Sequence, residues 1–146
     1  MTAVDSNAPL SLIIEDQQYM AQKISAALER HGAETIVFDG IFETEAFLSD
    51  AEGLRRHIRV VVLDWRETGL AVLRAVRSSA YLSYTPVVVL SSSDHYRDID
   101  SAYAQGANAF VTKADDLDEL EDQLEAIARF WLRHVQPPSF DPNREA

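Results

Sequence analysis

Short apolar runs alternate with amphipathic stretches along the chain. Five runs rich in β-branched residues have the length of strands, namely Leu10–Ile14, Glu34–Phe38, Val60–Leu63, Pro86–Leu90 and Ala109–Thr112. The third and fourth runs are apolar throughout, so we expect them to be central strands covered on both faces. The charge of Glu34 places the second run nearer an edge of the same sheet.

The stretches between these runs have the period of helices. Apolar residues at helical spacing predict a first helix over Tyr19–Arg30, and His31-Gly32 supplies its end. A last helix begins at Asp115-Asp116, and its apolar stripe continues through Trp131. Between them we expect helices at Ile41–Asp50, Leu70–Arg77 and Tyr96–Gln105.

A strand followed by a helix, repeated five times, predicts an α/β fold. The sheet should be parallel and doubly wound, with right-handed crossovers and helices on both faces. We find no repeat and no sign of a second domain, so we expect one domain over residues 9–134, with flexible tails at 1–8 and 135–146. Three prolines in the last segment, VQPPSFDPNREA, prevent it from continuing the helix.

The charge balance restricts the class of partner. Thirteen basic residues against 24 acidic ones give a net charge of −11, which disfavours binding to nucleic acid or to an anionic membrane. Cysteine is absent, which excludes disulfides and thiolate chemistry. No apolar run approaches the ~20 residues of a membrane span, and the first residues do not resemble a signal peptide. We therefore expect a cytoplasmic protein.

Charged and hydroxyl side chains follow several of the predicted strands. Glu15 and Asp16 follow the first strand and Asp64 follows the third, and in a parallel sheet these carboxylates meet at one edge. Three acids in one place repel unless a cation neutralises them, and an all-oxygen cluster suits Mg²⁺. Ser91 and Lys113 follow the fourth and fifth strands. A carboxylate nucleophile, a divalent cation and donors to phosphoryl oxygens are what phosphoryl transfer requires.

These elements carry a family resemblance. The segments IIEDQ, VVLD, PVVVLSSSD and GANAFVTK resemble the signature blocks of response-regulator receivers, the CheY-like domains, and cover residues 10 to 132. The resemblance implies a flavodoxin-like (βα)5 fold with the strand order 2-1-3-4-5. It also implies a role for each matching residue: Glu15 and Asp16 as the acidic pair for Mg²⁺, Asp64 as the phospho-acceptor and metal ligand, Arg66 as a metal ligand through its backbone carbonyl, Ser91 as the switch hydroxyl, Phe110 as the switch aromatic, and Lys113 as the phosphate-contacting lysine.

The second half of the chain resembles a narrower group. From Ser91 onward it is similar to single-domain regulators found beside bacterial phytochromes, whose last helix also closes with Phe-Trp-Leu. This similarity implies a histidine kinase partner of phytochrome type. Phe130 lies about 100° from Trp131 on a helical wheel and would be exposed in a monomer. We therefore expect a homodimer through the region of the last helix, or coverage of these aromatics by the proline-rich tail.

Two departures from the family pattern lie next to the predicted chemistry. The segment DWRETGL reaches Gly69 after five residues, so the loop after the acceptor is short and Arg66 can place a cation beside the phosphoryl site. That cation would screen an acyl phosphate from water or partly replace the charge of the metal. Ala114 stands where the family generally has proline, so we expect a trans peptide bond after Lys113.

Three functions are compatible with the sequence. The first is a stand-alone switch that accepts a phosphoryl group on Asp64 and changes the surface of its last two helices for a partner. The second is a degenerate receiver that binds proteins without phosphorylation. The third is an aspartate-dependent phosphatase, which is disfavoured because Arg66 occupies the position of the second catalytic acid.

Overall fold

Five strands form one parallel sheet in the order β2-β1-β3-β4-β5. The computed structural model describes residues 8–50 and 58–138. The strands are β1 (Leu10–Ile14), β2 (Glu34–Phe38), β3 (Ile58–Asp64), β4 (Val87–Ser91) and β5 (Ala109–Thr112). All of the predicted strands are present, β2 is at an edge, and the predicted order is confirmed.

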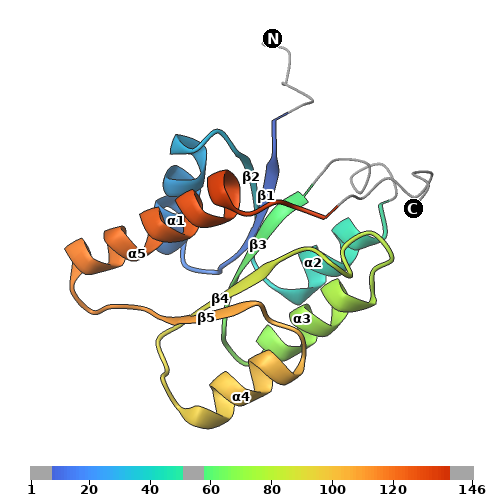
Figure 1. Cartoon of the computed structure of the whole chain (residues 1–146). Helices are drawn as coiled ribbons and strands as arrows, with labels where there is room; N and C mark the ends of the chain where they lie inside the picture. Colours follow the sequence, from blue (N-terminus) through green and yellow to red (C-terminus); the bar gives the residue numbers. More distant parts are fainter. Residues whose placement is uncertain (1–7, 51–57, 139–146) are drawn as a thin grey trace.

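The helices are divided between the two faces of the sheet. They are α1 (Gln18–Arg30), α2 (Ile41–Leu48), α3 (Gly69–Ser78), α4 (Tyr96–Ala104) and α5 (Leu117–Arg129). α1 and α5 cover one face, and α2, α3 and α4 cover the other (Figure 1). Among the described residues no helix has the length and apolar character needed to cross a membrane. Most of the two predicted tails lies outside the described residues.

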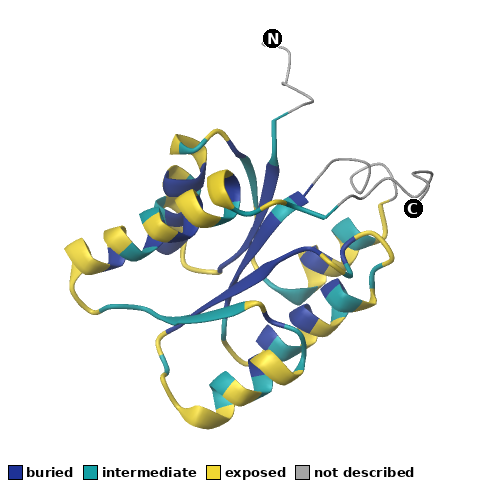
Figure 2. Cartoon of the chain, viewed as in Figure 1, coloured by how far each residue is buried: buried dark blue, intermediate teal, exposed yellow. Residues whose placement is uncertain are grey.

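The central strands bury their side chains on both faces. In β3, Val60 and Val62 pack with α1 and α5, whereas Val61 and Leu63 pack with α3. This alternation is the two-residue period of a strand, and it explains why β3 is almost continuously apolar. Figure 2 shows β1, β3 and β4 buried along most of their length, as the apolar runs predict.

The last helix departs from the predicted uninterrupted course. After α5, Phe130–His134 form a wider turn in which the Val135 N–H donates to the Phe130 carbonyl at 2.9 Å. The Arg59 guanidinium, from β3, donates to backbone carbonyls at 3.3 Å, those of Trp131, Leu132 and Val135. Carbonyls at a helix end need such partners. A strand residue thus holds the end of the chain's last helical segment.

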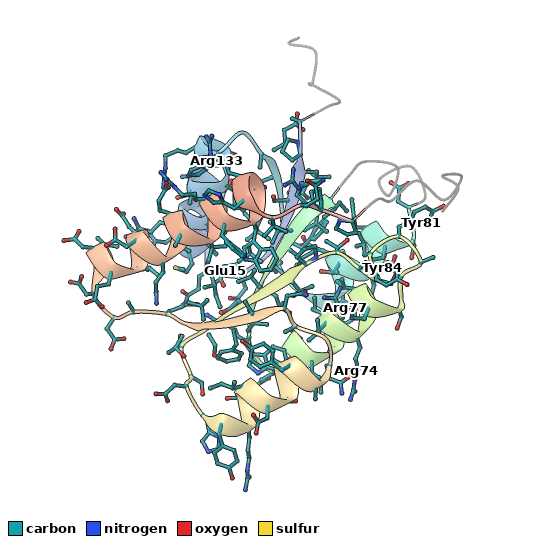
Figure 3. The ribbon with its side chains drawn as sticks, in the orientation of Figure 1. Glu15, Arg74, Arg77, Tyr81, Tyr84 and Arg133 are labelled. Atoms are coloured by element: carbon teal, nitrogen blue, oxygen red, sulfur yellow. The ribbon has the colours of Figure 1, made fainter. Side chains whose placement is uncertain are left out.

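A second arginine, Arg77, links two loops on the α3 and α4 side of the sheet. Arg77, at the end of α3, lies against the loop that follows α3 and the connection between α4 and β5 (Figure 3). Its guanidinium donates to the Gly106 carbonyl at 2.7 Å and the Thr85 carbonyl at 2.6 Å. It also donates to the Leu82 and Ser83 carbonyls and to the Asn108 side chain. One side chain therefore satisfies polar groups from two segments that are distant from each other in sequence.

We predict that Arg77→Met lowers the free energy of unfolding by about 2–4 kcal/mol, because several carbonyls lose a charged donor. Urea denaturation followed by circular dichroism measures the change. Arg74→Met is the matched control on the same helix. Arg74 is exposed, and within the described residues its guanidinium donates only to the Gln105 side chain. An equal loss in both variants would contradict the role assigned to Arg77.

Candidate functional site

The carboxyl ends of all five strands are held in register by backbone hydrogen bonds. The Trp65 N–H donates to the Leu90 carbonyl at 2.8 Å, and the Lys113 N–H donates to the Ser91 carbonyl at 2.7 Å. The Glu15 N–H donates to the carbonyl at the end of β2 at 3.0 Å. Each residue next to the site is therefore fixed by the ladder itself, as expected for a ligand site at this edge of a parallel sheet.

Glu15, Asp16 and Asp64 form an acidic cluster at this edge. One carboxylate oxygen from each lies within 4.8 Å of the others. Glu15 and Asp64 are buried, whereas Asp16 is exposed. The Oε2 atom of Glu15 is buried and has no hydrogen-bond partner among the described residues. Burial, together with the negative charge of Asp64, raises the pKa of Glu15 to about 7. An unpartnered buried oxygen among three acids fits a hard divalent cation.

Lys113 supplies one positive charge to the cluster. Its Nζ atom lies 2.8 Å from Asp64 Oδ1 and 4.0 Å from Glu15 Oε2, and its side chain is 11% exposed. The peptide bonds of the described residues are all trans, including the one between Lys113 and Ala114. Lys113 thus reaches Asp64 even though alanine, not proline, follows it.

Gln123 of α5 fixes the turn after β5. Its side-chain amide donates to the Thr112 carbonyl and accepts from the Ala114 N–H, both at 2.9 Å. These two bonds hold the backbone on either side of Lys113. Sequence reasoning missed this residue because a glutamine in an acidic stretch has the signature of a solvated helix face. Its role depends on how α5 packs.

Arg66 supplies the second positive charge. Its Nε atom donates to Asp64 Oδ2, Nη1 lies 3.3 Å from Asp16, and Nη2 lies 4.0 Å from Glu15 Oε1. One guanidinium therefore lies against all three acids, whereas the sequence had suggested only a cation beside the phosphoryl site. The Arg66 carbonyl accepts a hydrogen bond from the Gly69 N–H at 2.9 Å.

The two switch candidates lie at different depths. Ser91 is fully buried, its hydroxyl accepts from the Ser93 N–H at 3.0 Å, and it lines a hollow of about 670 Å³ together with Asp64 and Arg66. Phe110 is outside that hollow and is partly buried against the core on the α3 and α4 side. Its backbone N–H donates to the Tyr103 hydroxyl of α4 at 3.1 Å.

We predict that Lys113→Met lowers the free energy of unfolding by about 2–4 kcal/mol, because two buried carboxylates lose a cation that lies largely out of solvent. Thermal and urea denaturation without added divalent cations measure the effect. Lys23→Met is the control: it also breaks a lysine–carboxylate pair, with Glu121 at 2.6 Å, but on the surface. A loss for Lys113→Met no larger than for Lys23→Met would contradict the prediction.

Comparison with known proteins supplies the family. The model of the response regulator receiver domain matches residues 11–125. The chain belongs to the response regulator receiver family. It is a signalling protein of the two-component type, as the segments around the acidic cluster indicated. Receivers of this family accept phosphoryl groups from histidine kinases.

Relatives of two lengths resemble this receiver. It is 27% identical to the response regulator Rcp1 of Synechocystis over 144 residues, covering 92% of this chain and 97% of Rcp1. It is 33% identical to the response regulator protein PmrA of Pseudomonas aeruginosa over 123 residues, covering 81% of this chain. The chain spans about half the length of PmrA, 52%.

Two solved structures share the whole fold. The phosphorylated cyanobacterial phytochrome response regulator RcpA has a TM-score of 0.80 at 27% identity, over 90% of this chain and 99% of RcpA. The Mn²⁺-bound form of Rcp1 has a TM-score of 0.79 at 25% identity, with the same coverage. The flavodoxin-like receiver fold is thereby confirmed, and the acidic cluster of this receiver suits a divalent metal.

Proposed function

We propose that Asp64 is the residue that receives the phosphoryl group, from the phosphohistidine of a histidine kinase. The observation that carries the proposal is the position of Asp64: a buried carboxylate at the end of β3, 2.8 Å from Lys113 and beside Glu15 and Asp16. A receiver that had lost this activity would have no reason to keep like charges together in its interior. The complete set argues against a degenerate binding module.

The transfer makes one bond and breaks one. A carboxylate oxygen of Asp64 attacks phosphorus, a new O–P bond forms, and the P–N bond to the kinase histidine breaks with its electron pair left on nitrogen. Lys113 lies where its ammonium can contact a phosphoryl oxygen, and the buried hydroxyl of Ser91 can donate to another. Water reverses the modification by hydrolysing the acyl phosphate, so the receiver catalyses only its own phosphorylation and dephosphorylation.

Mg²⁺ would be held by the carboxylates of Glu15, Asp16 and Asp64, with the Arg66 backbone carbonyl as a further ligand. Bound there, the ion supplies positive charge against the phosphoryl oxygens. The unpartnered Oε2 of Glu15 supports this assignment. The Mn²⁺-bound form of Rcp1 supports a divalent cation at the corresponding cluster.

Phosphorylation would act on the surface made by α4, β5 and α5. Ser91 and Phe110 are the switch residues of this proposal, and Phe110 is joined to α4 through the Tyr103 hydroxyl. That bond is made by the Phe110 backbone N–H, so α4 would respond to a displacement of the β5 backbone that accompanies movement of the Phe110 ring. The similarity to RcpA supports a kinase of phytochrome type as the donor. The net charge of −11 supports protein partners rather than nucleic acid or membrane, and the cytoplasmic location stays an expectation from the sequence.

We predict that acetyl phosphate and Mg²⁺ add one phosphoryl group to the wild-type chain, and that Asp64→Asn abolishes the adduct. Intact mass spectrometry measures the added mass, and lability to base identifies an acyl phosphate. Asp39→Asn is the matched control, because Asp39 is an exposed aspartate just after β2, outside the acidic cluster. An adduct that persists in Asp64→Asn would show that another residue is the acceptor.

We also propose that the chain forms a homodimer through the region of its last helix. Phe130 is 52% exposed beside Trp131, with the two rings in edge-to-face contact at 5.1 Å between centroids. Trp131 is partly buried against the core, so Phe130 is an exposed ring supported by a fixed one, and such an aromatic can anchor an interface.

We predict that Phe130→Ser shifts the assembly toward monomer and raises the dimer dissociation constant roughly tenfold or more, because an aromatic anchor is lost. Sedimentation velocity over a range of protein concentrations measures the shift, with and without phosphodonor. Phe42→Ser is the control, since Phe42 is 84% exposed on α2, remote from α5 in the fold. Monomer–dimer curves that coincide for wild type and Phe130→Ser would exclude this interface.

A further inference from the structure

Both carboxylate oxygens of Asp64 are in use. Oδ1 lies 2.8 Å from Lys113 Nζ, and Oδ2 accepts a hydrogen bond from the Arg66 guanidinium. Each oxygen keeps a second lone pair for the attack on phosphorus, but a metal ion bound among the three acids would meet the Arg66 guanidinium at Oδ2. The Lys113 side chain is only 11% exposed, and its backbone is held by the β4 ladder and Gln123. Arg66 is 45% exposed, so it is the cation that is able to move.

Arg66 contacts the same acids that a divalent cation would use. Its three nitrogens face Asp64, Asp16 and Glu15, respectively. A guanidinium and a divalent ion cannot both lie at the centre of three carboxylates without like-charge repulsion and steric overlap. The two cations are therefore alternatives for the same oxygens.

The surroundings offer Arg66 a second position. Arg66 lines the hollow that contains Asp64, and together with Trp65 and Glu67 it also lines a neighbouring hollow of about 420 Å³, whose other lining residues are Leu70, Asp98 and Ser101. Asp98 supplies a carboxylate that lines only this second hollow, and Glu67 borders both hollows. A rotation about the side-chain bonds can thus carry the guanidinium from one acidic environment to another.

We propose that Arg66 is a displaceable counter-ion that competes with Mg²⁺ for Glu15, Asp16 and Asp64, and that leaves Asp64 when the metal and the phosphoryl group arrive. This inference rests on the proposed phosphorylation of Asp64. It adds one consequence for metal affinity. Because Arg66 competes for the same oxygens, the receiver binds Mg²⁺ more weakly than its three carboxylates alone would, so a higher Mg²⁺ concentration is needed to fill the site.

Isothermal titration calorimetry with Mg²⁺, without phosphodonor, tests the competition. Arg66→Met keeps much of the side-chain length and removes the charge, and we expect its Kd for Mg²⁺ to fall roughly fivefold, a modest change because the pair is partly solvated. Arg30→Met is the matched control. Arg30 is exposed at the C-terminal end of α1, whereas the acidic cluster lies next to the N-terminal end. The substitution therefore removes the same charge about 18 Å along the helix from Gln18.

The outcomes are separable. A Kd for Arg66→Met that improves on Arg30→Met by more than twofold supports the competition, and any smaller difference overturns it. Arg66→Gln provides a second neutral variant, and the rise in melting temperature on adding Mg²⁺ should be larger in both Arg66 variants than in wild type. If no phosphoryl adduct forms but the Mg²⁺ affinities change as expected, only the proposed acceptor role of Asp64 is contradicted. A normal adduct with unchanged affinities would remove only the competition.

Discussion

Repulsion among three carboxylates is the constraint around which this receiver is organised. A parallel sheet places the ends of β1 and β3 side by side, so Glu15, Asp16 and Asp64 cannot avoid each other. Water cannot screen them fully, because Glu15 and Asp64 are buried. The positive groups at this edge, Lys113 and Arg66, therefore stabilise the folded state as well as forming part of a site. Stability and chemistry are linked at one place.

The two cations answer that constraint in different ways. Lys113 comes from the end of β5, has little exposure and is fixed on both sides by backbone contacts. Arg66 comes from a short loop, is nearly half exposed and borders two hollows. A fixed charge can serve as a permanent part of a phosphoryl site, whereas a mobile one can be exchanged for a metal. The division follows from where each residue stands in the fold.

Much of this could be predicted from the sequence, because strand and helix periodicity are local properties. The apolar run in β3 identified a central strand, and the acids after β1 and β3 followed from parallel topology. The strand order came from the family resemblance. Arg66 was identified as a cation near the chemistry, but its simultaneous contact with three acids depends on side-chain direction. Arg59 gave no signal because its partners lie on an element distant in sequence, and Gln123 gave none because its contacts depend on how α5 packs against the turn after β5.

The anchoring of α4 is unequal at its two ends. At its C-terminal end, Gly106 has a φ of +102° and its carbonyl accepts two bonds from Arg77, and an added Cβ there would lie 2.9 Å from Arg77 Nε. At its N-terminal end the helix is held by side-chain bonds in the loop after β4, such as Ser93 to Asp98 at 2.9 Å. Motion of α4 should therefore be a swing about a pivot at Gly106, with the largest displacement near Tyr96. A partner that distinguishes the two states of the receiver would then contact the N-terminal end of α4 rather than its C-terminal end.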